Sequence, residues 1–374
     1  GKYERQPVQT RQKSYIPNNK YMTNMKQLLC LLTSLSVFFA CSTPNSKDSV
    51  KTYKATTDIT GKLSGEVIFA GQGIHNYYDV AITNDYYAFM DYYSDTLLQI
   101  RSKKDLSLHG IGEREKDTFI IAYPSFTKYD YINKNNKNKV SVWDNDSRKL
   151  KRMDLDQTSP ALSAELESMS DYGLEDACTN CCITSKELYA VQFNPHKPQV
   201  FFSSNKTNGQ YAVPGYPQIT VPIPATVLQK GYASDLTLNE EKGVIVAALR
   251  FIDCVNFYDM NCDMTASVSF ADYYTIPVPD ISNKYLDAEQ SKKCFIDICS
   301  SEQYVFCLFD GSTNFTGNSV IYVFDWEGKQ QAVLQADRNL RKIATEKSGE
   351  YLLALSPNGQ GGRDVIKYSL KNKI

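Results

Sequence analysis

The hydrophobic residues of this chain lie in short runs and follow no long helical period. From residue 62 onward, apolar and aromatic residues gather in brief stretches separated by Gly, Asp, Asn, Ser and Lys. No long segment repeats its apolar positions at i, i+3, i+4 and i+7, which is the spacing of an amphipathic helix. Short apolar runs with turn residues between them predict an all-β fold.

The clearest runs lie near the start of this region. They are GEVIFA (65–70), DVAIT (79–83), YYAFMDY (86–92), TLLQIRS (96–102) and LSLHG (106–110). The last four are joined by short polar turns, so they predict a four-stranded antiparallel meander. The first run, GEVIFA, stands apart from them.

The same alternation of strand and turn recurs to the end of the chain. It is found in residues 139–155, 187–193, 199–204, 236–270, 294–310, 319–335 and 342–370. Grouped as meanders, residues 61–374 give six units of about 50 residues, a period typical of a β-propeller with four-stranded antiparallel blades. The last unit has three strands, so we expect the N-terminal strand 65–70 to complete it and close the ring. A β-sandwich with insertions is the alternative fold.

The N-terminal region has the pattern of an export signal. Residues 25–41 begin with Met25 and Lys26, continue as an apolar run and end at Ala40 and Cys41. The run is too short to span a bilayer as a helix, which needs about 20 apolar residues, and it has the layout of a secretory signal peptide. Residues 1–24 are a polar leader upstream of a complete signal, and we predict that they are not native structure.

The end of that signal resembles the lipobox of bacterial lipoproteins. In such a protein the cysteine becomes the new N-terminus and its sulfur is acylated, so the resemblance implies that Cys41 is the lipidation site. Phe38 and Phe39 depart from the usual leucine and small residue. Residues 42–60 contain almost no large apolar side chains and predict a flexible tether. Plain secretion is the alternative to lipidation.

Charge and composition narrow the range of partners. The chain has 41 basic and 42 acidic residues, and residues 1–41 hold six of the former and one of the latter. Beyond Cys41 this leaves 35 basic and 41 acidic residues, a net charge of −6. A mildly acidic body does not attract nucleic acid. The chain has 26 Tyr and 17 Phe, and aromatic side chains favour β structure.

Three further segments carry a family resemblance. They are Gly110-Ile111-Gly112 after the first meander, VSVWD (140–144) and VIYVFD (320–325). Together with the signal and lipobox, they resemble the TolB-like six-bladed β-propeller lipoproteins of Gram-negative envelopes, over roughly residues 62–374. Glu113 stands where many members have proline after the Gly-x-Gly. The resemblance implies a propeller fold and an outer-membrane lipoprotein, facing the periplasm or the surface, and it implies no activity.

The most conspicuous candidate for chemistry is the cysteine group Cys178, Cys181 and Cys182. A structural zinc site needs four ligands, and there is no second Cys-x-x-Cys to supply them, so we predict no metal site. In an exported protein thiols tend to oxidise, and a disulfide involving these three residues is our hypothesis. Buried free thiols are the alternative.

Tyrosine doublets are candidates for ligand stacking. Neighbouring residues in a strand face opposite sides, so each doublet sends one ring outward. Tyr77, Tyr78, Tyr92 and Tyr93 lie close together in sequence and are the candidates for stacking on a sugar or a peptide. Packing between sheets is the alternative use of these rings.

No catalytic set is recognisable in the sequence. The three histidines are His75, His109 and His196, and no metalloprotease, nucleophile-elbow or phosphate-loop motif accompanies them. We therefore expect no cofactor and predict a non-enzymatic binding or scaffold module for an envelope protein, peptide or glycan. The alternative is a hydrolase or lyase with a metal or carboxylate site at the mouth of the propeller channel.

Overall fold

The described strands all lie in the second of two compact units of the chain. These units are Gly1–Ser49 and Val50–Ile374. The computed structural model describes residues 49–71, 76–91, 94–113, 124–131, 138–144, 149–157, 165–168, 178–192, 200–204, 209–212, 216, 219, 221–272 and 274–374. The predicted leader, signal peptide and Cys41 lie outside these residues.

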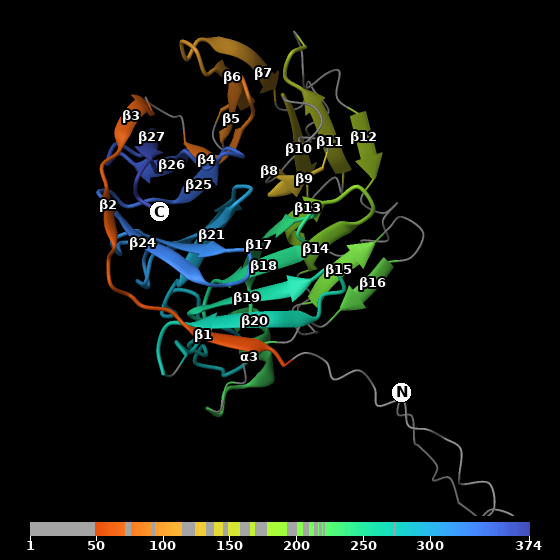
Figure 1. Cartoon of the computed structure of the whole chain (residues 1–374), viewed down its shortest axis with the longest axis vertical. Helices are drawn as coiled ribbons and strands as arrows, with labels where there is room; N and C mark the ends of the chain where they lie inside the picture. The colour runs from red at the N-terminus through yellow and green to blue at the C-terminus, as the bar shows by residue number, and fades with distance from the viewer. Residues whose placement is uncertain are drawn as a thin grey trace, which may run out of the picture. The chain divides into compact units, whose positions relative to one another are not determined.

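Six sheets, each with four antiparallel strands, form the second unit (Figure 1). Blade 1 contains β4 (Tyr77–Ile82), β5 (Tyr86–Asp91), β6 (Thr96–Ser102) and β7 (Leu108–Glu113). Blade 2 contains β8 (Pro124–Phe126), β10 (Lys139–Asp144), β11 (Lys149–Asp154) and β12 (Glu165–Ser168). Blade 3 contains β13 (Cys178–Ile183), β14 (Leu188–Gln192), β15 (Val200–Ser204) and β16 (Gly209–Ala212), with β9 (Tyr129–Asp130) added beside β13.

The second half of the ring repeats this arrangement. Blade 4 contains β17 (Ser234–Asn239), β18 (Val244–Leu249), β19 (Cys254–Asp259) and β20 (Met264–Ser269). Blade 5 contains β21 (Phe295–Ser300), β22 (Tyr304–Phe309), β23 (Val320–Asp325) and β24 (Gln330–Ala336). Blade 6 contains β25 (Lys342–Thr345), β26 (Tyr351–Pro357), β27 (Arg363–Ser369) and β3 (Glu66–Phe69). The predicted all-β six-bladed propeller is confirmed.

The sheets are held together by apolar cores between neighbouring blades. In β22, Val305 and Cys307 pack toward blade 4, whereas Phe306 and Leu308 pack toward blade 6. Both faces of the blade 5 sheet are therefore covered by neighbouring blades, because successive side chains of a strand point to opposite faces. This explains why strands such as VIYVFD are almost continuously apolar.

Closure of the ring follows the sequence prediction. β3 pairs antiparallel with β27, with Val67 opposite Ile366, so the N-terminal strand is the fourth strand of blade 6. A core that includes Tyr77 and Phe89 of blade 1 with Leu353 and Val365 of blade 6 joins the first blade to the last. Pairing the terminal strand inside the last sheet covers an edge that would otherwise be exposed.

The N-terminal segment covers more of the ring than the sequence suggested. β1 (Lys51–Lys54) pairs parallel with β20, and β2 (Gly61–Leu63) pairs parallel with β24. The sequence predicts a flexible tether up to residue 60, and the strand β1 corrects this. Backbone pairing requires no large side chain, so a segment poor in apolar residues can still add to a sheet edge. We call residues 50–69 the N-terminal strap, because they run along the outer edges of blades 4, 5 and 6.

Helix is scarce in the described part of the chain. The helix α3 (Ala225–Gly231) precedes β17, and its Leu228 packs against the buried cluster of Leu249, Ile252 and Cys254 at the turn between β18 and β19. Within the described ranges, no helix has the length and apolar character needed to cross a membrane.

Candidate functional site

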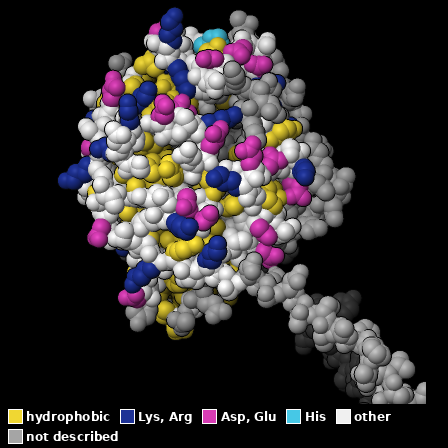
Figure 2. All heavy atoms as spheres, in the orientation of Figure 1, with side chains coloured by type: hydrophobic (Ala, Val, Ile, Leu, Met, Phe, Trp, Pro, Cys, Tyr) yellow, Lys and Arg dark blue, Asp and Glu magenta, His cyan; other side chains and the backbone are white. Residues whose placement is uncertain are grey.

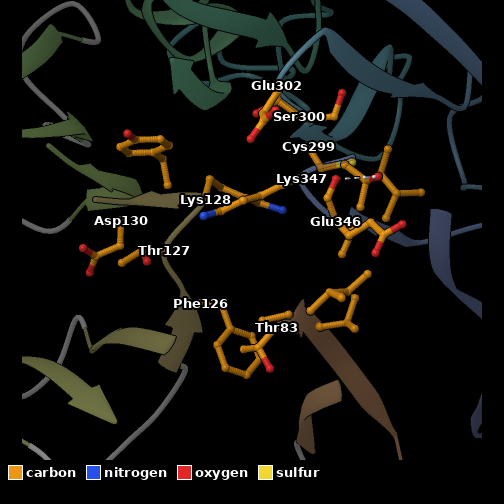
Figure 3. Close-up of a pocket in the computed structure, with 18 of the residues that line it drawn as sticks. Thr83, Phe126, Thr127, Lys128, Asp130, Cys299, Ser300, Glu302, Glu346 and Lys347 are labelled. Carbon is orange, nitrogen blue, oxygen red and sulfur yellow. Dashed lines mark hydrogen bonds between the residues drawn. The ribbon is translucent and has the colours of Figure 1, made fainter. Parts of the chain in front are cut away.

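A cavity of about 540 Å³ occupies the mouth of the channel where β4, β17, β21 and β25 end (Figure 3). The innermost strands of a propeller run in the same direction, so their C-terminal ends meet on one face. The turns that follow these strands line the cavity together with residues 126–130. Sequence-distant residues, from Asp79 to Ser348, are thereby brought to a single site.

A short polar side chain closes the turn after several inner strands. Oγ1 of Thr83 accepts a hydrogen bond from the backbone N of Tyr86 at 3.2 Å. Oγ of Ser301 accepts one from the backbone N of Tyr304 at 3.0 Å. Ser and Thr end strands in this way because the hydroxyl replaces a backbone acceptor. The rim of the cavity is therefore built from turns with locally fixed geometry.

The segment between β8 and β9 crosses from one blade to the next inside the channel. The backbone N of Thr127 donates to the carbonyl of Ser141 in blade 2 at 3.0 Å, and the backbone N of Lys128 donates to the carbonyl of Cys181 in blade 3 at 3.1 Å. This crossing carries the Lys128 side chain into the channel, at the floor of the cavity (Figure 3).

Lys128 reaches blade 5 across the channel. Its Nζ lies 2.6 Å from Oδ1 of Asp297, and the two side chains are 11% and 0% exposed. Nζ of Lys342 in blade 6 lies 3.2 Å from the same oxygen, and the backbone N of Ile343 donates to Oδ2 of Asp297 at 2.8 Å. One buried carboxylate therefore joins three blades beneath the cavity.

The charges of this cluster are stabilised in their ionised forms. Burial disfavours the charge of Lys128, but the carboxylates of Asp297 and Asp79 outweigh it and raise the pKa of Lys128 above its ordinary value. Burial also opposes the charge of Asp297, and Lys128 and Lys342 outweigh it, so the pKa of Asp297 is lowered. Both groups are therefore charged near neutral pH, where neither exchanges a proton readily.

The direction of the Asp297 side chain follows from an irregularity in β21. The register of β21 against β22 shifts between Phe295 and Asp297. The register of β4 against β5 shifts in the same way between Tyr77 and Asp79. A β-bulge re-aims the side chains beside it. Here each bulge precedes an aspartate that accepts a hydrogen bond from the next blade.

The upper part of the cavity carries both charges and apolar surface. The charged residues along it are Lys103, Lys139, Lys347, Glu241, Glu302 and Glu346. Phe126, Ile343 and Trp326 also line the cavity and are largely buried, whereas Ala81 and Ile82 are partly exposed. Figure 2 shows side chains of both signs interspersed over the face that it presents. Such a lining offers donors, acceptors and apolar contacts to one ligand.

The candidate stacking tyrosines that the structure describes lie away from this cavity. Tyr77 is fully buried, its hydroxyl donates to Oε1 of Gln99 at 2.9 Å, and its ring packs 5.1 Å from that of Phe89. It offers no ring surface for stacking on a ligand, because it fills the core between blades 6 and 1. The Tyr78 hydroxyl donates to the carbonyl of Pro124 at 2.6 Å. The side chains of Tyr92 and Tyr93 lie outside the described residues.

The cysteine group forms part of a strand that the sequence did not predict. Cys178, Cys181 and Cys182 lie in β13, and all three are buried. Burial raises the pKa of Cys178 and of Cys182 to about 12, so these thiols are poor nucleophiles near neutral pH. The disulfide hypothesis remains a prediction for mass measurement with and without reduction. Within the described residues, no three His, Cys, Asp or Glu side chains gather as metal ligands.

The positions of the histidines bear on the choice between an enzyme and a binding protein. His109 lies on β7, the outer strand of blade 1, and its Nε2 is 2.8 Å from the carbonyl oxygen of Leu155. It does not line the cavity. His75 and His196 lie outside the described residues, as does the predicted lipidation site Cys41.

The residues that form the cavity floor were not predicted from the sequence. A recurring pattern nonetheless marks the aspartates of this site: an Asp or Asn is followed by an apolar residue and, four positions on, by Thr, Asn or Ser. It is found in DVAIT (79–83), NCCIT (180–184), DLTLN (235–239) and DICSS (297–301). These segments are the inner strands β4, β13, β17 and β21, so the pattern was the available signal.

Comparison with protein families gives a match over most of the ring. The family described as TolB-like 6-blade propeller-like matches residues 138–347, which is more than half of the 374 residues. The matched range begins beside β10 and includes Asp297 and Lys342. No curated protein matches the chain significantly.

Solved structures resemble the chain at low sequence identity. A putative exported protein from Bacteroides fragilis is 12% identical with a TM-score of 0.49, over 86% of this chain and 99% of that one. The β-propeller domain of Cps50 (Swd1) from Myceliophteria thermophila is 10% identical with a TM-score of 0.43, over 81% and 99%. Hydrazine synthase from Kuenenia stuttgartiensis is 8% identical with a TM-score of 0.45, over 76% and 75%.

Proposed function

Because the chain belongs to the TolB-like 6-blade propeller-like family, we propose that it is an outer-membrane-anchored lipoprotein that binds a partner. The propeller is the binding module, and the ligand is a peptide segment of an envelope protein. A fold does not specify a function, so the proposal rests on the channel-mouth cavity. Its volume of about 540 Å³ is that of a ligand pocket.

The chemistry of the cavity favours a peptide. A peptide presents backbone donors and acceptors, charged groups of either sign and apolar side chains. The rim offers Lys103 and Lys347 together with Glu302 and Glu346, and the partly buried apolar side chains of Ala81 and Ile82 belong to the same lining. A polyanion would meet these carboxylates as well as the lysines, and a body with a net charge of −6 repels it.

The floor of the cavity supports binding over catalysis. General acids and bases work best when their pKa lies near the working pH. The pKa of Lys128 is raised by its carboxylate neighbours, and that of Asp297 is lowered by its lysine neighbours. Burial raises the pKa of the Cys299 thiol, which disfavours a thiolate nucleophile. These shifts weigh against the alternative of a hydrolase or lyase at this mouth.

The lipid anchor rests on the sequence of residues 25–41. We expect the protein to incorporate labelled palmitate in cells, and the Cys41→Ala variant to lose this label. Retention of the label in Cys41→Ala would exclude Cys41 as the acyl acceptor.

Site-specific crosslinking tests the proposed ligand. A photoreactive residue replaces Asn84, an exposed residue at the cavity rim, and in a matched control replaces Lys186, an exposed turn residue that does not line the cavity. We expect a protein adduct at position 84 in intact cells, none at position 186, and a weaker adduct at 84 when Glu302→Arg is added. Equal adducts at 84 and 186, or an adduct with a glycan, would refute the peptide proposal.

A further inference from the structure

The connection between blades 4 and 5 exposes apolar side chains on a short hairpin, residues 278–287. Ile281 is 105% exposed, Tyr285 is 58% exposed and Val278 is 38% exposed. Pro279 and Leu286 form an antiparallel bridge, and the backbone N of Asp287 donates to the carbonyl of Val278 at 2.8 Å. The hairpin therefore presents Ile281 at its tip.

Hydrogen bonds within the hairpin fix the tip in place. Oδ1 of Asp280 accepts from the backbone N of Lys284 at 3.0 Å and from that of Tyr285 at 3.1 Å. The Ser282 hydroxyl also donates to Asp280, at 2.9 Å. The carboxylate is thus engaged by its own turn, whereas Ile281 and the exposed Lys284 project from it. Exposed apolar side chains on an ordered turn are typical of a protein or membrane contact.

Residues around α3 extend the same surface. Nζ of Lys230 lies 5.0 Å from the ring centre of Tyr285, and Gly231 lies against Pro277. Val221, just before α3, is 47% exposed. In Figure 2, apolar side chains stand at the lower edge of the molecule, at the position of α3 in Figure 1. Apolar, tyrosine and lysine side chains occur together at this edge.

The strap brings the proposed anchor to this blade. β1 lies along β20, and Lys54 at its end forms an ion pair with Asp272, near the start of the connection that holds the hairpin. Lys51 lies ten residues beyond Cys41, and a fully extended chain of that length reaches at most about 36 Å. The tether therefore keeps the start of β1 within about 36 Å of the surface that holds the anchor.

We propose that the 278–287 hairpin inserts Ile281 and Tyr285 into the interface of the bilayer that holds the lipid anchor. The inference rests on the anchor in the proposed function. Isoleucine gains from leaving water, tyrosine favours the boundary between headgroups and acyl chains, and lysine is attracted to anionic lipid. The hairpin would orient the ring on the membrane, which a single flexible tether does not do.

A fluorescent probe at the tip tests this inference. Ile281→Cys in the acylated protein is labelled with a polarity-sensitive, thiol-reactive fluorophore, and the control is Leu108→Cys on β7, where the native side chain is 54% exposed. The eight described cysteines are buried, so labelling favours the introduced thiol. On vesicles of phosphatidylethanolamine and phosphatidylglycerol, we expect the probe at 281 to shift to shorter wavelength and to resist quenching by iodide. The probe at 108 stays unchanged.

Flotation of the same vesicles distinguishes failure of the hairpin inference from failure of the proposed lipid anchor. If the protein floats but the probes at 281 and 108 are quenched equally, the hairpin inference is wrong and the anchor stands. If the acylated preparation does not float, the anchor is wrong and the hairpin inference fails with it. A probe at 281 that is protected by envelope proteins and not by lipid would assign the hairpin to a protein partner instead.

Discussion

The innermost strands of blades 1 and 5 share one local feature, a bulge followed by an aspartate, but the aspartate of blade 5 has an additional role. In both, a bulge in the innermost strand precedes an aspartate that accepts a hydrogen bond from the next blade: Asp79 from the backbone N of Phe126 at 2.9 Å, and Asp297 from that of Ile343 at 2.8 Å. Asp297 also forms ion pairs with two lysines, Lys128 and Lys342. The bulge and its aspartate therefore link neighbouring blades at two places in the ring. In blade 5, the segment that carries Lys128 adds an ion pair, and Asp297 becomes part of the cavity floor.

Blade 3 has the same bulge with an uncharged residue. The register of β13 shifts between Cys178 and Asn180, and Oδ1 of Asn180 has no hydrogen-bond partner among the described residues. At this position, therefore, the strand keeps its irregular geometry without the link to the next blade. The carboxylate is thus not needed to form the bulge, and its contribution can be tested separately.

The largest effect is expected from Asp297→Asn. Asparagine keeps an acceptor for the backbone N of Ile343 but leaves the buried charge of Lys128 without its partner. Removing one member of a buried ion pair costs about 3 to 5 kcal/mol, and we expect a loss in the free energy of unfolding at the lower end of that range. Urea denaturation measures it.

A double variant provides the control for this prediction. Lys128→Met combined with Asp297→Asn removes the unpaired ammonium, so it should be more stable than Asp297→Asn alone. If the double variant is as unstable as the single one, the charge of Lys128 is not the cause of the loss.

A smaller effect is expected from Asp79→Asn. Asp79 accepts hydrogen bonds from the backbone N of Phe126 and of Val80, and asparagine retains one of its two acceptor oxygens. Losing a hydrogen bond to a charged acceptor costs about 1.5 kcal/mol, so the loss should be about half of that in Asp297→Asn. A loss as large as that of Asp297→Asn in the same urea titration would contradict this order of effects.

No effect of pH is expected across the neutral range. The pKa of Asp297 is lowered in the folded protein. Its contribution to the free energy of unfolding is therefore fully present above the carboxyl pKa of about 3.9 in the unfolded chain, and it is lost as pH falls through the pKa of the folded state. The pKa of Lys128 is raised, so its contribution is present below about 10.4 and is lost as pH rises through the folded pKa. The stability difference between wild type and Asp297→Asn should stay constant from about pH 5 to pH 9. A slope in that difference near pH 7 would contradict these shifts.

Much of the fold was predictable from short apolar runs and turns. The strands of blades 1, 4, 5 and 6, and the pairing of residues 65–70 with the last blade, follow from alternation and from the need to close the ring. β13 was missed because CTNCCI (178–183) contains one aliphatic residue, and its cysteines suggested redox chemistry instead. β1 was missed because KTYK (51–54) pairs through its backbone and buries little side chain.

The candidate site was not predictable in the same way. Its floor joins Lys128 to Asp297, which are 169 residues apart, and no local pattern specifies which blades face each other across a channel. The aspartates could be recognised as a repeat, but Lys128 could not, because its role comes from a backbone segment that leaves blade 2 and joins blade 3. Burial then sets the charge states, and burial is a property of the assembled ring.

The N-terminal strap also determines how the molecule would carry mechanical load. Tension applied ahead of Val50 enters the propeller at β1, which lies parallel to β20, so the pull runs along the strand and loads its hydrogen bonds in shear. β2 on blade 5 is next in line, and β3 in blade 6 is last. Detachment would therefore proceed from blade 4 toward blade 6, and the strand that seals the ring would be the last to feel the force.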